Sequence, residues 1–221
     1  EANEAAIKLA RLYGHNKGIE TPEIIVMDKS FHGRTMATLS ATGNRKVQAG
    51  FEPLVSGFIR VPYDDVDAVK QIASRKSNVV AILVEPVQGE GGINIPKDAS
   101  GYLETLREIC DANGWLLMLD EVQTGIARTG TWFAFQHTNI KPDVMSLAKG
   151  LGSGVPIGAC VASGKAAEIF TYGKHGSTFG GNPLATAAGL ATLNIIEEES
   201  LRENAEKIGN LIREGFNAEF K

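Results

Sequence analysis

Lys149 stands where a lysine has the surroundings to act as a nucleophile. It follows the apolar run 144–147 and precedes the glycine-rich stretch 150–154 (GLGSG). Most lysines are solvated surface charges, because ammonium groups are rarely buried. At the mouth of a buried sheet, however, desolvation lowers the pKa of a lysine, and a neutral amine attacks an aldehyde to form an imine. Position alone leaves both interpretations of Lys149 open.

Asp120 supplies a second group in the same place. It follows the apolar run 115–119, so we expect its carboxylate at the sheet edge near Lys149. One interpretation is a helix cap or a structural ion pair. The other is a partner for a protonated pyridine nitrogen, which keeps the ring cationic and therefore an electron sink for a carbanion. On the same turn, Gln123 has the chemistry to bond a ring phenolate oxygen and Val122 to pack under a flat ring. An exposed amide and ordinary core packing are the alternatives for these two.

Phe31 and Arg34 follow the first apolar run of the chain. A lone phenylalanine usually packs in the core, but at a sheet edge its ring can also stack on a heteroaromatic cofactor. Arg34 either clamps a carboxylate with its planar fork or forms an exposed ion pair. Further along, the turn-rich loop 176–183 (GSTFGGNP) precedes a helical stretch. Its hydroxyls and backbone N–H groups suit a phosphate, whereas Asn182 suits a plain helix cap.

Six short apolar runs are predicted to be the strands that position these residues. They span residues 24–27, 58–61, 79–84, 115–119, 144–147 and 157–162. The runs are continuous rather than alternating apolar and polar, which is typical of strands buried on both faces. Helical stretches lie between them. One of these has a single apolar face and ends at Asn113-Gly114; the face consists of Tyr102, Leu103, Leu106, Ile109 and Cys110.

This alternation predicts an α/β fold with a mostly parallel sheet and helices on both faces. In such sheets, ligands bind beyond the carboxyl ends of the strands. Four polar or glycine-rich loops follow strand runs directly, at residues 30–34, 85–92, 120–125 and 148–150. We therefore expect a binding site where these loops meet.

Composition narrows the classes of protein. The chain has 221 residues, of which 43% are hydrophobic and 22% charged, and its net charge is -4. These values are typical of one globular domain, and without a dense Lys/Arg run they argue against nucleic-acid or anionic-membrane binding. No apolar run reaches the roughly 18 residues of a transmembrane helix, and no signal peptide opens the sequence. Cys110 and Cys160 lie in apolar segments and suit a reducing compartment, so the prediction is a cytoplasmic protein.

Both ends of the sequence predict helices without clear boundaries. Helical apolar spacing begins at Ala5, and a long C-terminal helix is expected from about residue 184, without a Gly or Pro stop signal near its end. We interpret the whole of 1–221 as one ligand-binding domain, truncated at both ends, with the C-terminal helix leading toward a further domain.

Taken together, these motifs resemble the class III aminotransferases of the fold type I superfamily, which depend on pyridoxal 5'-phosphate (PLP). The resemblance rests on six stretches in family order, and within the family it is strongest to the acetylornithine type. The stretches are 1–11 (EANEAAIKLAR), 30–43 (SFHGRTMATLSATG), 83–93 (LVEPVQGEGGI), 119–130 (LDEVQTGIARTG), 146–152 (SLAKGLG) and 176–185 (GSTFGGNPLA).

The resemblance implies a role for each matching residue in the cofactor site. Lys149 would form the Schiff base with PLP, and Asp120 would pair with the pyridinium nitrogen. Gln123 would contact the phenolate oxygen and Phe31 would stack on the ring. The turn that carries Gln123 also contributes two further expected cofactor contacts, Glu121 and Val122. No metal is implied.

The substrate site and a partner subunit follow from the same resemblance. Arg34 and Ser177 would contact the substrate. Thr178 would bind the cofactor phosphate of the neighbouring subunit in a homodimer. Glu90 matches an acid that pairs, in related enzymes, with an arginine near the C-terminus, and that arginine is not in this sequence.

The implied reaction moves an amino group from N2-acetyl-L-ornithine, or a similar ω-amino donor, to 2-oxoglutarate, as in arginine biosynthesis. Rivals within the family are ornithine, succinylornithine and 4-aminobutyrate aminotransferases and aminomutases. The stretch 41–54 favours the acetylornithine type. A dinucleotide-binding oxidoreductase has a similar sheet, but no GxGxxG follows the first strand. A non-catalytic fragment that only folds or dimerises is the third alternative.

Overall fold

The computed structural model describes residues 1–219, and its sheet has six strands in the order β2-β1-β3-β4-β5-β6. The first five strands of the chain are mutually parallel where they pair, and β6 is antiparallel to β5. The predicted α/β class with a mostly parallel sheet is confirmed. The strand bounds are β1 Glu23–Met27, β2 Phe58–Val61, β3 Val79–Val84, β4 Leu116–Asp120, β5 Val144–Leu147 and β6 Ala159–Ala162.

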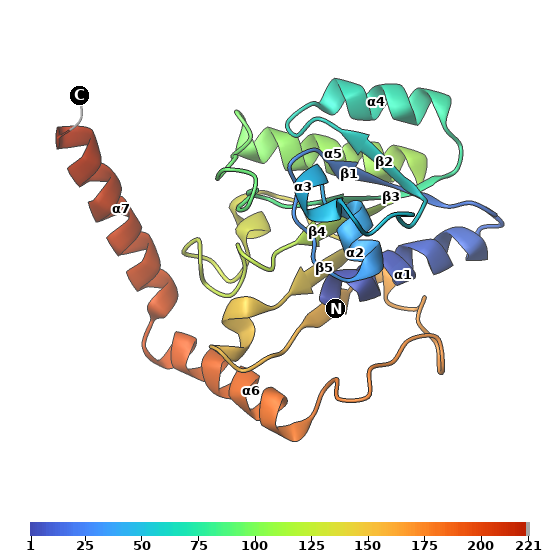
Figure 1. Ribbon diagram of the computed structural model, residues 1–221. Helices are drawn as coiled ribbons and strands as arrows, with labels where there is room; N and C mark the ends of the chain where they lie inside the picture. The colour runs from blue at the N-terminus through green and yellow to red at the C-terminus, as the bar shows by residue number, and fades with distance from the viewer. Residues whose placement is uncertain (220–221) are drawn as a thin grey trace.

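Helices cover both faces of this sheet, with α4 and α5 on one side and α1 on the other (Figure 1). Successive side chains of a strand point to opposite faces. In β3, Ile82 therefore packs in the core under α5, whereas Leu83 packs in the core under α1. The central strands are apolar at nearly every position because both of their faces are covered. The helices are α1 Ala2–Asn16, α2 Met36–Ala41, α3 Arg45–Gln48, α4 Val66–Arg75, α5 Ala99–Asn113, α6 Pro183–Glu198 and α7 Leu201–Glu219, with short 3-10 turns η1 Ala134–His137, η2 Lys149–Gly152 and η3 Gly164–Ala166.

Helix α5 follows the sequence prediction residue by residue. The five apolar residues predicted to lie on one face are its buried residues. The Asp98 side chain accepts a hydrogen bond from the backbone N–H of Gly101 and caps the first turn. Gly114 ends the helix with a φ of 66°, a left-handed conformation that glycine adopts without strain. Helix α5 thereby delivers the chain into β4, whose last residue is Asp120.

The two edge strands depart from the prediction of burial on both faces. In β2, Arg60 is exposed and two other residues are half-buried, and β6 has no buried residue. Both strands have a neighbour on one side only, so one edge of each lies open. An apolar run therefore marked a strand correctly but overstated its burial at the two ends of the sheet.

The C-terminal part of the described chain contains two helices, not the single helix expected from about residue 184. Helix α6 begins at Pro183 after an Asn182 cap and ends at Glu198, and α7 begins at Leu201. Ser200 between them has a φ of 51°, which no helix continues through. Helix α7 points away from the sheet (Figure 1). Within residues 1–219, no helix is both long enough and apolar enough to cross a bilayer.

Candidate active site

A cavity of about 150 Å³ lies beyond the carboxyl ends of the parallel strands, and the predicted loops line it. A space of this size is about what a single six-membered aromatic ring needs. The lining residues come from the start of α1 and from the segments that follow β1, β3, β4 and β5. They are Glu1, Ala2, Asn3, Phe31, His32, Gly33, Glu85, Asp120, Val122, Gln123, Ala148 and Lys149.

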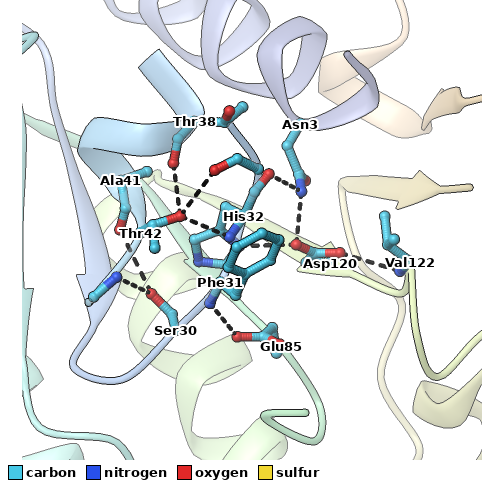
Figure 2. A network of polar contacts seen from close by, with 12 residues as sticks. Asn3, Ser30, Phe31, His32, Thr38, Ala41, Thr42, Glu85, Asp120 and Val122 are labelled. Carbon is cyan, nitrogen blue, oxygen red and sulfur yellow. Dashed lines mark hydrogen bonds and ion pairs between the residues drawn. The ribbon is translucent and has the colours of Figure 1, made fainter. Parts of the chain in front are cut away.

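Asp120 is a buried carboxylate with three hydrogen-bond donors (Figure 2). Its side chain is only 4% exposed. Asn3 Nδ2 donates to Oδ2 at 2.6 Å, His32 Nδ1 lies 2.8 Å from the same oxygen, and the backbone N–H of Val122 donates to Oδ1 at 3.1 Å. Because a carboxylate only accepts, His32 carries its proton on Nδ1 here. These contacts hold the Asp120 carboxylate in a fixed orientation beside the cavity.

Asn3 and His32 hold the Asp120 carboxylate, and the sequence reasoning assigned a role to neither of them. Asn3 also donates to the backbone oxygen of His32 at 2.9 Å, so the two partners of Asp120 are tied to each other. His32 Nε2 and Asn3 Oδ1 are buried with no hydrogen-bond partner among the described residues. Buried polar atoms are normally paired, so unpaired atoms beside a cavity are suited to a ligand. The signal in the sequence was the position of His32 beside Phe31 in a loop that follows a strand.

Glu85 is a second buried carboxyl at this cavity and was also not assigned. Its Oε1 accepts a hydrogen bond from the backbone N–H of Phe31 at 2.9 Å. Burial is the main cause that raises the Glu85 pKa to about 7. The negative charge of Asp120 acts in the same direction, and His32 and the N–H groups of Phe31 and Gly89 act against it. Glu85 comes directly after β3, in one of the loops that the strand pattern had marked.

Lys149 lines the same cavity as Asp120, as the sequence predicted. Its side chain is exposed rather than buried, so the expected desolvation of this lysine is wrong for this structure. Its backbone has a φ of 44°, in the left-handed region that a non-glycine residue rarely occupies. Such conformations cluster at functional sites because the surroundings must hold them in place.

Phe31, Val122 and Gln123 also line the cavity. Gln123 lies against Gly89 so closely that a Cβ atom at Gly89 would come within 2.6 Å of its Cδ. The glycine after β3 is therefore required for the side chain of Gln123 to occupy this place. The structure brings together five of the sequence-predicted residues here, namely Lys149, Asp120, Val122, Gln123 and Phe31.

Glu121, which the resemblance also placed among the cofactor contacts, has different surroundings from Asp120. Its side chain is buried but does not line the cavity. The carboxylate accepts hydrogen bonds from the Thr124 hydroxyl and from the backbone N–H groups of Ala134 at 3.0 Å and Phe135 at 2.9 Å. Successive residues at a strand end point in opposite directions, so Asp120 faces the cavity and Glu121 fastens the η1 loop.

The remaining predicted residues lie on the surface. The Arg34 guanidinium lies 5.4 Å from the centre of the Phe31 ring, at the cavity wall. Ser177 and Thr178 line a wider groove of about 1250 Å³, which shares Glu1, Ala2 and Ala148 with the cavity. Glu90 is exposed and lines neither space.

The comparisons with known proteins agree with this geometry. The family model described as "Aminotransferase class-III" matches residues 1–221. The chain therefore belongs to the class-III aminotransferase family, as its motifs and the α/β sheet with a lysine and a buried aspartate at its carboxyl edge had indicated.

Individual relatives show which members of the family this chain is similar to. The acetylornithine aminotransferase of Nitrosomonas europaea is 68% identical over 216 residues, which cover 98% of this chain and 54% of that protein. Acetylornithine aminotransferase 1 of Bordetella pertussis is 56% identical over 209 residues, covering 95% and 53%. The chain thus spans about half the length of the curated relatives it matches.

Solved structures give the same result for the fold. The structure of ornithine aminotransferase from Toxoplasma gondii ME49 superposes with a TM-score of 0.94 at 38% identity, covering 100% of this chain and 52% of that one. A second structure of ornithine aminotransferase from Toxoplasma gondii, with a TM-score of 0.93, has partial occupancy of PLP at its active site.

Proposed function

We propose that the protein carrying this chain is a PLP-dependent aminotransferase that transfers an amino group from N2-acetyl-L-ornithine, or a similar ω-amino donor, to 2-oxoglutarate. The observation that carries the proposal is the cavity at the sheet edge, where the buried Asp120 and Lys149 line one ring-sized space. Identity of 68% to an acetylornithine aminotransferase supports this choice of donor. The reaction would then serve arginine biosynthesis.

The residues of the cavity fit PLP chemically. When bound, PLP supplies an aldehyde that takes up an amine and a pyridinium ring that accepts the electrons of a carbanion. Asp120 is a carboxylate that three donors already orient, and it suits a cationic ring nitrogen. Phe31 and Val122 offer apolar surfaces to a flat ring, and Gln123 offers an amide to its hydroxyl. Lys149 is the amine of the cavity.

Each residue then has a distinct part in the reaction. Asp120 would hold a proton on the ring nitrogen, because its buried carboxylate is placed to pair with a cationic ring. The Nζ amine of Lys149 would remove a proton from the substrate carbon as general base, and the resulting ammonium would return a proton as general acid. Arg34, on the surface over the Phe31 ring, would bind a substrate carboxylate with two parallel N–H donors.

A second candidate is an ornithine aminotransferase, which the superposition on the Toxoplasma gondii enzyme favours. Both reactions use the same cofactor groups and differ only in the donor. Sequence identity is higher to the acetylornithine enzymes, at 68% and 56% against 38%, so the acetylated donor is the first choice.

A homodimer is the expected assembly, with Thr178 of one subunit completing the phosphate site of the other. The groove that Thr178 lines shares three residues with the cavity, and the chain around Thr178 is exposed from residue 171 to residue 181. A cytoplasmic location stays a prediction from composition.

Borohydride labelling of the complete gene product tests the proposal. The protein is incubated with PLP, reduced, digested and mapped by mass spectrometry. We expect the pyridoxyl label on Lys149 and no label in Lys149→Ala. A label on another lysine would refute the assignment. Parallel turnover assays with N2-acetyl-L-ornithine, ornithine and 4-aminobutyrate then rank the donors, and a faster reaction with ornithine would favour the second candidate.

A further inference from the structure

The Glu85 side chain connects two walls of the cavity. Its carboxylate accepts a hydrogen bond from the backbone N–H of Phe31 at 2.9 Å, and the nearby backbone N–H of Gly89 favours its ionised form and so lowers its pKa. Phe31 belongs to the segment after β1, and Gly89 lies directly against the Gln123 side chain. The buried carboxyl of Glu85 therefore lies between the main chain that carries the Phe31 ring and the loop that contacts the Gln123 amide.

The main chain of Glu85 is held independently of its side chain. The Tyr63 hydroxyl lies 3.1 Å from the backbone oxygen of Glu85 and 2.8 Å from that of Pro86. A truncated side chain at position 85 would leave these contacts in place. The expected loss is confined to the link from Glu85 to Phe31 and Gly89.

We propose that Glu85 is a positioning residue for the cofactor ring, which acts by fixing the main chain of Phe31 and of the loop against Gln123. The proposal rests on the proposed function, because the ring it serves is that of PLP. A glutamine has an amide oxygen that can accept the Phe31 hydrogen bond without charge, so the presence of a buried carboxyl points to a second contribution from its charge. Burying an ionisable group is unfavourable, and a purely mechanical link does not need one.

The titratable groups around Glu85 set the surroundings in which its charge would act. His32 comes from the segment after β1, Asp120 from the end of β4, Tyr63 from the segment after β2, and Lys149 from the segment after β5. The Glu85 pKa of about 7 places its ionisation within the working range of an ordinary enzyme. The ionised carboxyl would add a second negative charge near Asp120 and favour a cationic ring.

The test uses the PLP dissociation constant of the complete gene product, measured from the visible absorbance of bound PLP. We expect Glu85→Ala to weaken PLP binding about fivefold, the equivalent of one hydrogen bond, and Glu85→Gln to restore it at about pH 6. Glu121→Ala is the control, since it removes a buried carboxyl that accepts from backbone N–H groups and from the Thr124 hydroxyl but does not line the cavity. Equal weakening in Glu121→Ala would mean general destabilisation and would overturn the proposal, as would a Glu85→Ala value within a factor of about two of wild type.

A pH series tests whether the charge of Glu85 contributes to PLP affinity, and it does not depend on the folding of Glu85→Ala. Between about pH 6 and about pH 8.5 the wild type loses the Glu85 proton and Glu85→Gln has none to lose. We expect the PLP affinity of the wild type relative to Glu85→Gln to rise about threefold over this range. A constant ratio overturns the contribution of the charge. Labelling of Lys149 in the same samples separates the two proposals: a labelled lysine with unchanged affinities refutes only the role of Glu85, whereas no label on Lys149 refutes the cofactor site itself.

Discussion

The cavity at the sheet edge and the segment 171–182 both contain predicted site residues, but the two regions differ in burial and in hydrogen bonding. In the cavity, Asp120 is buried and held by donors from α1 and from the segment after β1. In the segment, every residue from 171 to 181 is exposed, and two large apolar side chains, Tyr172 and Phe179, are 105% and 80% exposed.

This contrast indicates a division of labour within one proposed site. Groups that must be oriented for chemistry are fixed by hydrogen bonds inside this chain. Groups expected to meet the phosphate, such as Thr178, lie on a surface that the described residues do not cover. Variants in the cavity should therefore act on chemistry itself, and variants in the segment should act through assembly.

The largest effect is expected for Asp120→Asn. Asparagine keeps the shape but loses the charge that holds a proton on the ring nitrogen, and such terms are worth roughly 3–4 kcal/mol, or about two to three orders of magnitude in kcat. Turnover of the complete gene product measures this, with circular dichroism to verify the fold. A folded variant with near-normal turnover would show that the orientation of this carboxylate is not used for chemistry.

The next effect concerns stability and comes from Glu85→Gln. The native state keeps the Glu85 proton up to about pH 7, whereas the reference value of the free carboxyl is 4.5. Ionised Glu85 thus lowers the free energy of unfolding; this cost is absent below about pH 4.5, grows as the pH rises and is complete above about pH 7. We expect Glu85→Gln to be more stable than the wild type by about 2 kcal/mol near pH 8, and equally stable near pH 4.5. Urea titrations at both pH values measure the difference, and a gap that is largest at low pH would contradict it.

Arg34→Lys tests whether Arg34, an exposed residue next to the cavity residue Phe31, binds the substrate or supports the cofactor ring. Lysine retains the charge but lacks the fork for bidentate binding of a carboxylate. We expect the KM for carboxylate-bearing substrates to rise by roughly tenfold while the PLP dissociation constant stays within a factor of about two. Unchanged KM values with weaker PLP binding would instead make Arg34, through its place over Phe31, part of the ring-binding wall.

The smallest effect is expected for Thr178→Ala, and its value lies in how it combines with another variant. Loss of one hydroxyl should weaken PLP binding by about fivefold. If Thr178 serves the neighbouring subunit, a mixed dimer of Thr178→Ala and Lys149→Ala subunits contains one site with both changes and one with neither. Mixing two differently tagged variants and purifying the mixed dimer should therefore recover normal PLP affinity at half of the sites. No recovery would assign Thr178 to its own chain's site or to no site.

Local patterns in the sequence were enough to predict the strands, helix α5, and the positions of Asp120 and Lys149 at the carboxyl ends of β4 and β5. Each of these depends on periodicity or on the rule that ligands bind beyond strand ends. The partners of Asp120 were missed, because Asn3 is 117 residues away along the chain and meets it only when α1 packs on the sheet. The opposite directions of Asp120 and Glu121 were equally hidden, since a motif does not show which of two adjacent carboxyls faces inward.

The break between α6 and α7 was missed for a different reason. The apolar spacing continues through it, and no glycine or proline marks Ser200, whose positive φ separates the helices. The open edges of β2 and β6 likewise depend on strand order, which a run of apolar residues does not encode.

The separation of α7 from the sheet divides the molecule into two parts that need not unfold together. Helix α7 has no buried residue, and Ile208, Leu211 and Ile212 on its surface are between 41% and 62% exposed. Beyond its first turn, where Leu201 packs against a core cluster and Arg202 lies over Trp132, uncoiling α7 would expose little apolar area that is not already in water, so the cost is mainly that of its own backbone hydrogen bonds. Its amide protons should therefore exchange with deuterium long before those of β3 and β4, which can exchange only when the sheet itself opens.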